Sequence, residues 1–222
     1  MTPSALMVHW LARYSLRQAF RGVWLQGSLP ETPAGVVVFL NHNLWWDVYL
    51  ALLLASYHSR PLTGWLENWQ AFPPFGSVGA LPFPPDDAAV RAVTMRQTVR
   101  RLTHSRTMLV LYPEGVLHDG AEVRAFGRAL WWLNTRLPDV PCVPAAVHAV
   151  FGADQRPILR VSLGQSVPTS GDEQSWLEMA RSRVVSLRQE LVDRRASDTH
   201  GMTCMLEGHE SIDTRWKRWA RR

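Results

Sequence analysis

The sequence predicts a single α/β domain, in which a largely parallel or mixed central sheet is flanked by helices. Three observations lead to this fold class. The chain has 222 residues, which is enough for one domain with a substantial core. Short apolar runs alternate with longer segments of helical period, the pattern of layered α/β folds. Capping and turn residues separate these segments, and no internal repeat interrupts them.

The expected strands are short, rich in β-branched and aliphatic residues, and bounded by turn-prone residues. They cover residues 36–40, a short stretch near 61–63, 108–112, 142–149 and 157–163. The expected helices cover residues 5–25, 44–56, 87–104, 126–136 and 172–195. Asp86 or Asp87 is the expected N-cap of the third helix, and Asp172 opens the last one. Residues 64–79, rich in Trp, Phe and Pro, are expected to be irregular or short-helical.

The chain divides into three expected parts. Residues 1–30 form an amphipathic N-terminal helix, residues 31–195 form the central domain, and residues 196–222 form a basic Trp/Arg tail. Three arginines at four-residue spacing form a stripe along the helix, with Leu11 on the opposite face: Arg13, Arg17 and Arg21. Such a helix suits a membrane interface. A helix packed on the domain with a solvated arginine face, and a tail disordered until it binds, remain open alternatives.

Composition points to an acidic partner, because the net charge is +5 and the pI is near 9.9. No helix-turn-helix, zinc or RNA-binding signature favours nucleic acid. An anionic membrane surface suits better, since residues 215–222 alternate cations with indoles, and each surface cation contributes about 1 kcal/mol. No apolar window long enough for a transmembrane helix appears, and two cysteines suggest a reducing compartment. We therefore expect a cytoplasmic protein peripherally bound to a membrane.

A histidine and a carboxylate follow the first predicted buried strand. His42 lies at the turn after residues 36–40, and Asp47 falls about one turn into the next helix. A carboxylate there can reach back to one imidazole nitrogen and leave the other free as a base. Glu114 follows the strand at 108–112 in the same way. Because parallel strands end at one edge of a sheet, these groups are expected to form one site.

Four sequence blocks resemble one known family. They are His-x4-Asp at residues 42–47, a Gly-containing turn into a strand at 75–83, Pro-Glu-Gly at 113–115, and a strand opened by proline at 143–147. In this order they resemble the glycerolipid acyltransferases, over about residues 36–167. The resemblance implies transfer of a fatty acyl group from acyl-CoA or acyl carrier protein to a hydroxyl of a lipid acceptor. It implies no cofactor beyond this donor and no metal.

The resemblance also assigns roles. His42 is the expected general base, and Asp47 holds the imidazole and stabilises the imidazolium. Glu114 is associated in the family with recognition of the acceptor, and Gly115 permits the tight turn beside it. The residues expected to contact the acceptor are Asn43, Pro113, Glu114, Gly115 and His118.

The sequence departs from the family pattern at two arginines that are associated with the acceptor's phosphate. The corresponding positions are residues 83–85 (Phe-Pro-Pro) and 116–118 (Val-Leu-His), and neither offers a permanent cation. We therefore hypothesise an acceptor without a glycerol phosphate, such as a glycolipid, another hydroxylated lipid or an aminolipid. Compensation by Arg91 or Arg124 stays open.

Other functions remain possible at this stage. A non-catalytic peripheral membrane protein would keep the fold and bind lipid through its Arg/Trp segments. A thioester hydrolase would use the same base with water. His118 and Asp119 could join His42 and Asp47 in a metal site, although no further ligand is spaced to complete it. The joint presence of His42, Asp47 and Glu114 favours the enzyme, because a binding module has no use for that set.

Overall fold

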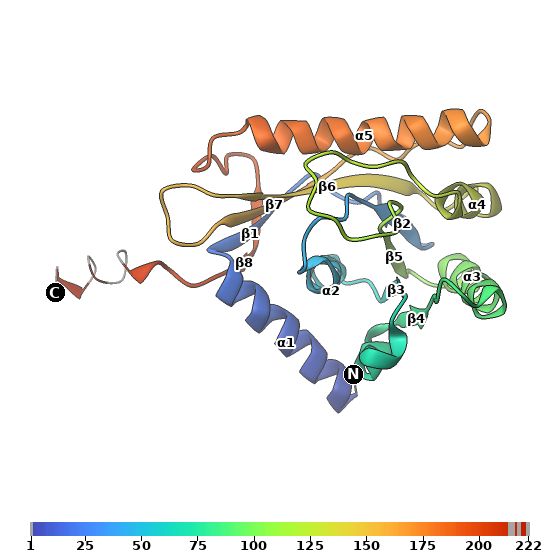
Figure 1. Ribbon diagram of the computed structural model, residues 1–222, viewed down its shortest axis with the longest axis horizontal. Coiled ribbons are helices and arrows are strands. Elements are labelled where there is room, and N and C mark those ends of the chain that lie inside the picture. Colours follow the sequence, from blue (N-terminus) through green and yellow to red (C-terminus); the bar gives the residue numbers. More distant parts are fainter. Residues whose placement is uncertain (1, 213–215, 217–218, 221–222) are drawn as a thin grey trace.

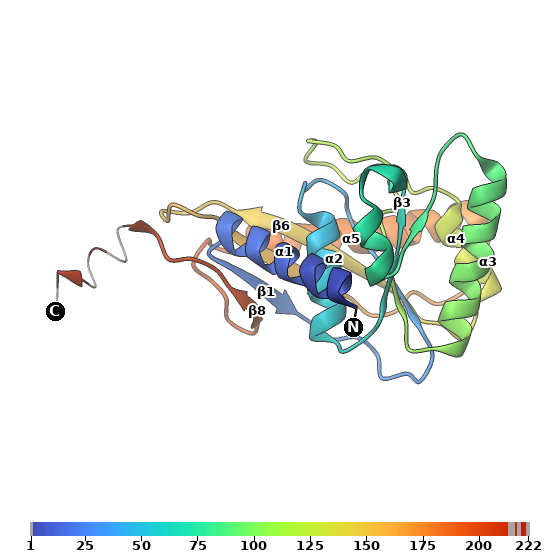
Figure 2. The ribbon, with the colours of Figure 1, turned by 90° about the horizontal axis from the view of Figure 1, so that it is seen from below.

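The computed structural model describes all of the chain except residues 1, 213–215, 217–218 and 221–222. Three layers make up the fold, with one mixed sheet between two layers of helices (Figure 1, Figure 2). Helices α1 (Pro3–Ala19) and α2 (Asp47–Tyr57) pack on one face. Helices α3 (Ala88–His104), α4 (Ala129–Arg136) and α5 (Glu173–Asp193) pack on the other. The predicted α/β class is confirmed.

The sheet has eight strands in the order β4-β3-β5-β2-β6-β7-β1-β8. The first five strands of this order, β4, β3, β5, β2 and β6, run parallel to one another, and β7 runs parallel to β1. The β6/β7 and β1/β8 pairs are antiparallel. In chain order the strands are β1 (Gly22–Gln26), β2 (Val36–Phe39), β3 (Leu62–Leu66), β4 (Ala80–Pro82), β5 (Met108–Leu111), β6 (Cys142–Val150), β7 (Ile158–Leu163) and β8 (Thr203–Glu207).

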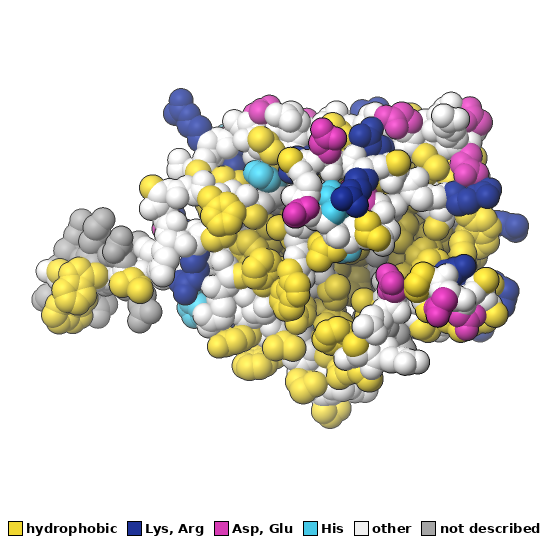
Figure 3. All heavy atoms as spheres, in the orientation of Figure 1, with side chains coloured by type: hydrophobic (Ala, Val, Ile, Leu, Met, Phe, Trp, Pro, Cys, Tyr) yellow, Lys and Arg dark blue, Asp and Glu magenta, His cyan; other side chains and the backbone are white. Residues whose placement is uncertain are grey.

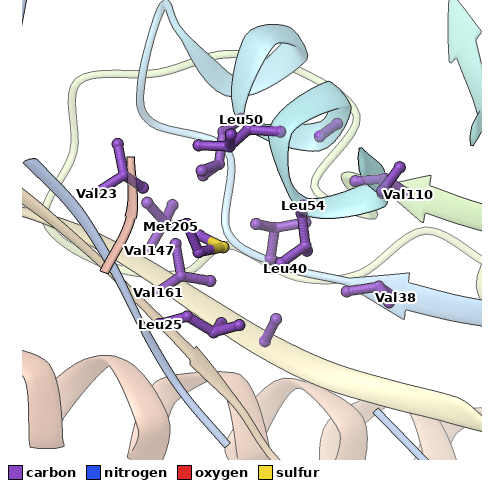
Figure 4. Packing of buried hydrophobic residues seen from close by; sticks show 14 of the residues in the cluster. Val23, Leu25, Val38, Leu40, Leu50, Leu54, Val110, Val147, Val161 and Met205 are labelled. Carbon is purple, nitrogen blue, oxygen red and sulfur yellow. The ribbon is translucent and has the colours of Figure 1, made fainter. Parts of the chain in front are cut away.

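Strand β2 lies between β5 and β6 and is buried along its whole length. Its side chains alternate between the two faces of the sheet, as the period of a strand requires. Val36 and Val38 join the cluster under α1 and α2, while Val37 and Phe39 join the cluster under α3, α4 and α5. Figure 4 shows the first cluster, where Leu50 and Leu54 of α2 lie over the sheet. A strand covered on both faces explains the uninterrupted apolar run.

The predicted helix caps agree with the structure. The side chain of Asp87 accepts a hydrogen bond from the N–H of Val90 at the start of α3, and Asp172 accepts one from Ser175 at the start of α5. The helix expected at 44–56 begins three residues later, so Asp47 is its first residue. Of the segment 64–79, expected to be irregular or short-helical, residues 64–66 belong instead to β3. The remainder contains two short 3-10 helices, η1 (Trp69–Ala71) and η2 (Pro73–Val78), as expected.

Glycine is required where η2 turns into β4. Gly79 has a φ of +99°, and a Cβ built on it would lie 1.9 Å from the carbonyl oxygen of Leu62 on the neighbouring strand. No side chain fits that space without separating β3 from β4. The Gly-containing turn of the middle sequence block is therefore a structural necessity of the sheet edge.

The structure differs from the sequence expectations at both ends of the chain. The N-terminal helix ends at Ala19, and residues 22–26 form β1 within the sheet instead of continuing the helix. Val23 and Leu25 point into the core there, with the two-residue period of a strand. A strand of five residues directly after a helix is too short for this period to be recognised in the sequence. Strand β8, within the segment expected to be tail, pairs with β1. The cations expected in the tail at 215, 217–218 and 221–222 lie outside the described residues.

Helix α1 is amphipathic in a different way from the prediction. Its buried face carries mainly small or branched residues at helical spacing, namely Ala5, Val8, Ala12 and Leu16. Large apolar side chains remain exposed along this helix, and Leu11, on the face opposite the arginines, is among them: Leu6, Met7, Trp10, Leu11 and Tyr14. Arg21 lies beyond the helix and pairs with Asp154. Within the described part of the chain, no helix combines the length and apolar character needed to span a bilayer.

Candidate active site

The two main sequence motifs meet at the carboxyl ends of neighbouring strands. Strands β2 and β5 pair in parallel, with Phe39 opposite Leu111. His42 follows β2 by three residues, and Glu114 follows β5 by three residues. A hydrogen bond of 2.7 Å from the backbone N–H of His42 to Oε1 of Glu114 joins the motifs directly. The expectation that they lie together at this edge of the sheet is met.

Asp47 reaches back from the first turn of α2 to the imidazole, as the spacing predicts. Its Oδ2 lies 2.8 Å from His42 Nδ1 and also accepts a 3.2 Å hydrogen bond from the N–H of Leu44. The Asp47 side chain is 1% exposed, whereas that of His42 is 21% exposed. Burial raises the pKa of Asp47 from its ordinary value, opposed by its hydrogen bond with His42. Because an ionised carboxylate can only accept, Nδ1 is the donor in this contact, and in the neutral imidazole the free lone pair is on Nε2.

Tyr112 is a site residue that the sequence analysis missed. Its ring stacks on the imidazole of His42, and the two centroids are 4.4 Å apart. Its hydroxyl donates a 2.6 Å hydrogen bond to the backbone carbonyl of Asp47. Burial raises the pKa of Tyr112 well above its ordinary value, and the charge of Asp47 raises it further, so the hydroxyl remains a donor. Its place directly before Pro-Glu-Gly, at the end of β5, was the available signal.

Asn41 is a second missed residue. Its side chain is buried, and it exchanges two hydrogen bonds with the backbone of Val147 on β6, donating at 3.1 Å and accepting at 2.9 Å. Its Nδ2 also donates to Oδ1 of Asn43 at 2.8 Å. The amide thus continues the β2/β6 pairing beyond the end of β2 and fixes the chain immediately before His42. Asn43, which was expected to contact the acceptor, accepts this hydrogen bond from Asn41 through its side chain.

Glu114 has an internal set of partners. Its Oε1 accepts from the N–H of His42, and its Oε2 accepts from the N–H of Arg124 at 2.6 Å and pairs with Nε2 of His118 at 2.7 Å. The side chains of Glu114 and His118 are 0% and 4% exposed. Their expected contact with an acceptor stays a prediction. Gly115 has a φ of +79°, consistent with the tight turn expected there.

A cavity of about 770 Å³ opens beside the His42 imidazole. It runs between α2, β3 and the η2 segment, and its walls are mainly apolar. The lining includes Leu44, Val48, Leu62, Trp65, Phe75 and Phe83. Of the predicted site residues, His42, Asp47, Pro113 and Gly115 line the cavity, while Asn43, Glu114 and His118 are not part of its lining. This size and lining suit a small apolar molecule or chain.

The two arginines considered as replacements for the missing cations differ in position. Arg91 lines the cavity, and its guanidinium donates hydrogen bonds to the backbone carbonyls of Pro84 and Pro85. Arg124 is exposed and is not part of the lining; its backbone N–H is bonded to Glu114. Among the described residues, Arg91 is therefore the one Lys or Arg side chain at the cavity, and it is engaged by its own loop.

No metal-binding cluster accompanies this arrangement in the part of the chain that the structure describes, where no three His, Cys, Asp or Glu side chains converge for an ion. His118 directs Nε2 at Glu114, and Asp119 is exposed. What the arrangement can do is acid–base chemistry. An imidazole oriented by a buried carboxylate faces a cavity, with a stacked phenol behind it.

Comparisons with known proteins agree with this geometry. The family model described as Acyltransferase matches residues 26–148, more than half of the chain. No curated protein matches the sequence at a significant level. The fold is similar to the crystal structure of the 1-acyl-sn-glycerophosphate (LPA) acyltransferase PlsC from Thermotoga maritima, with a TM-score of 0.66 and 14% identity over 86% of this chain and 81% of that one. The chain belongs to the acyltransferase family, as the resemblance of its four blocks to the glycerolipid acyltransferases predicted.

Proposed function

We propose that this acyltransferase moves a fatty acyl group from a thioester donor, acyl-CoA or acyl carrier protein, to a hydroxyl of a lipid acceptor. His42 is the general base, and Asp47 orients it. The observation that carries the proposal is the 2.8 Å contact between His42 Nδ1 and a carboxylate that is almost fully buried, while the imidazole lines an apolar cavity. This arrangement fixes one tautomer of the imidazole and supports base chemistry at Nε2.

The proposed reaction is a direct transfer. Nε2 of His42 takes the proton of the acceptor hydroxyl as its oxygen attacks the thioester carbonyl. The carbon–sulfur bond then breaks, and the imidazolium returns the proton to the leaving thiolate. The products are an ester and a free thiol. No cysteine of the protein needs to take part: Cys142 is buried outside the cavity, and burial raises the pKa of its thiol to about 12.

The apolar cavity supports a fatty acyl chain as the group transferred. Aromatic and aliphatic side chains make up most of its lining, and Trp65 stacks on Phe83 with 4.3 Å between the ring centroids. A thioester carbonyl held next to the imidazole would leave the chain to occupy this apolar region. Burial of the chain favours binding by about 0.8 kcal/mol per methylene.

The acceptor is proposed to lack a glycerol phosphate. Arg91 donates to carbonyls of its own loop, and no other Lys or Arg among the described residues lines the cavity. Phosphate recognition relies on such cations, most often through paired hydrogen bonds from arginine. A glycolipid, another hydroxylated lipid or an aminolipid suits this lining better. Comparing lysophosphatidate with uncharged hydroxylated acceptors tests the idea, and a strong preference for lysophosphatidate would contradict it.

Peripheral binding to an anionic membrane completes the proposal. The exposed apolar side chains of α1 lie beside Arg13 and Arg17, a composition that suits the headgroup boundary. Figure 3 shows hydrophobic side chains gathered over α1 and the region next to it. Phe75 and Val78 line the cavity and also belong to the cluster that packs under α1. A membrane beneath α1 would therefore lie close to the cavity wall.

The decisive experiment measures thiol release and ester formation together. Purified protein receives acyl-CoA or acyl carrier protein with a lipid extract, and His42→Ala provides the background. His104→Ala, which changes an exposed histidine on α3, is the matched control and should keep full activity. Acceptor-dependent thiol release that is lost only in His42→Ala supports the proposal. Release without any acceptor would instead indicate a hydrolase, and vesicle binding without turnover would indicate a non-catalytic module.

A further inference from the structure

Both polar groups of the His42 backbone are held by residues that follow β5. The N–H of His42 donates to Glu114 Oε1 at 2.7 Å, and the C=O of His42 accepts from the N–H of His118 at 3.2 Å. His42 lies in the irregular segment between β2 and α2, so neither a helix nor a sheet ladder fixes its backbone. The contacts from Glu114 and His118 take over that task.

The Glu114 carboxylate is fully committed to the protein. It accepts hydrogen bonds from two backbone N–H groups, those of His42 and Arg124, and it pairs with His118 Nε2. Its side chain is 0% exposed. A buried carboxylate is stable only when such partners compensate for its lost hydration, and charge-assisted hydrogen bonds of 2.6–2.7 Å are among the stronger ones. An acceptor would have to displace one of these partners to reach it.

The side chain of His118 is the third partner of the Glu114 carboxylate. Its side chain is 4% exposed, and Nε2 is 2.7 Å from Glu114 Oε2, so this nitrogen donates its proton to the carboxylate. Its Nδ1 is buried and has no hydrogen-bond partner among the described residues. Neither Glu114 nor His118 is part of the cavity lining, whereas His42 is. The pair therefore contacts the backbone of the proposed base without lining the cavity.

We propose that Glu114 and His118 are positioning residues for His42, acting through its backbone instead of contacting the acceptor. Glu114 and His118 together anchor the N–H and C=O of His42, and thereby set where the imidazole meets the cavity. This inference rests on the proposed function of His42 as base. A misplacement of about 1 Å at a catalytic group can cost on the order of 100-fold in rate. Losing the anchors should accordingly lower the rate of the chemical step.

The first test separates kcat from KM. Glu114→Gln keeps the shape of the side chain but replaces one acceptor oxygen by an NH2 group, which then faces N–H donors of His42 or Arg124. We expect kcat to fall on the order of 100-fold, with the KM for the acceptor changed by less than about twofold. A residue that bound the acceptor equally in ground and transition states would show the opposite result. A raised KM with unchanged kcat overturns the inference.

His118 offers a graded series for the same measurement. His118→Ala removes the donor to Glu114, while His118→Gln retains an N–H that can reach the carboxylate. We expect kcat to fall about 10-fold to 100-fold in His118→Ala and to recover partly in His118→Gln. Equal activity of both variants to the parent would contradict the role of His118. Glu190→Gln and His104→Ala, at exposed positions on α5 and α3, are the matched controls and should behave as the parent does.

A second readout does not depend on activity. Hydrogen exchange of the His42 backbone amide reports directly on its bond to Glu114. We expect faster exchange at this amide in Glu114→Gln and His118→Ala than in the parent, at equal global stability by urea unfolding, and parent-like exchange in the controls. Unchanged exchange overturns the inference even if the parent proves to have another activity. A parent without acyl transfer but with this exchange pattern would refute only the proposed function.

Discussion

The ring of Tyr112 lies against the imidazole of His42, with 4.4 Å between the centroids and 29° between the planes. The same side chain donates its hydroxyl proton to the carbonyl of Asp47, 2.6 Å away. One residue at the end of β5 therefore contacts both the proposed general base, His42, and its carboxylate partner, Asp47. It limits rotation of the imidazole from one side while Asp47 fixes Nδ1 from another. The geometry of the pair depends on β5 as much as on α2.

Replacing Tyr112 by Phe should separate these two contacts. The ring remains and the hydroxyl is lost, so the first turn of α2 loses one link to β5. We expect a loss of about 1 kcal/mol in the free energy of unfolding, typical of one hydrogen bond, and a fall in kcat of less than about 10-fold. Urea unfolding and steady-state kinetics measure both. Tyr112→Leu, which also removes the stacked ring, should lose more activity than Tyr112→Phe, and equal losses would contradict a role for the ring.

Asp47→Asn should abolish most activity without destabilising the fold at neutral pH. The amide cannot stabilise the imidazolium and does not enforce the tautomer, a change that costs on the order of 10⁴-fold in serine-protease triads. Because burial raises the pKa of Asp47, its ionised form is unfavourable in the folded protein, and the variant loses that unfavourable charge. Activity assays and urea unfolding at neutral pH test this. Retained activity would contradict the orienting role.

The same substitution makes a prediction about pH. In the folded protein the pKa of Asp47 is raised above the ordinary 3.8, so the folded chain keeps a proton that the unfolded chain has lost. The stability that Asp47 contributes is therefore complete below the ordinary value and is lost as pH rises to the folded value. The free energy of unfolding of the parent minus that of Asp47→Asn should fall across this window. A difference that rises with pH would mean that the folded pKa is lowered.

Gly64→Leu tests where the acyl chain lies. Gly64 is on β3 and lines the cavity, and a Cβ built on it has the carbonyl oxygen of Val110, 3.9 Å away, as its near neighbour. A Cβ therefore fits here without displacing backbone, and the rest of the leucine side chain would fill apolar space of the cavity. We expect at least a tenfold shift in kcat/KM from long-chain to short-chain donors, the size of effect of a methylene or two. Ala89→Leu, at an exposed position on α3, is the control, and an unchanged donor preference in Gly64→Leu would mean that the acyl chain lies elsewhere.

Local signals in the sequence predicted much of the fold. The buried run ending at Leu40, and the capping aspartates Asp87 and Asp172, act through neighbours a few residues away, and these elements agree with the structure. His42 and Asp47 are also close in sequence, so their contact followed from a turn and the start of a helix. Features of this kind can be predicted from the sequence because they depend only on residues a few positions apart.

The remaining features depend on partners far along the chain. Strand β8 becomes a strand because β1 offers an edge about 180 residues earlier, and its own five residues carry little pattern. Asn41 meets the backbone of Val147, 106 residues away, and Glu114 meets His42 from 72 residues away. Nothing local distinguishes a glutamate that binds an acceptor from one that holds another turn. Its complete burial and its hydrogen bonds to His42, Arg124 and His118 are what support the positioning role proposed above.

The exposed face of α1 gives the last prediction. Trp10 and Tyr14 are 63% and 48% exposed and stack on each other with 5.3 Å between centroids, one turn apart on the helix. Two large rings exposed to water next to Arg13 and Arg17 lower their free energy when they enter a headgroup layer. Trp10→Ala with Tyr14→Ala should weaken binding to vesicles containing anionic phosphatidylglycerol by more than tenfold, equivalent to about 1.4 kcal/mol.

The matched control for this pair is Val185→Ala with Val192→Ala, which removes exposed apolar side chains from α5 on the opposite side of the sheet (Figure 1). Vesicle sedimentation measures the binding, and an assay with a detergent-dispersed acceptor measures turnover without a bilayer. The α1 variant should lose vesicle binding and keep turnover in detergent, because neither Trp10 nor Tyr14 lines the cavity. Equal binding by the parent and the α1 variant would mean that another surface meets the membrane.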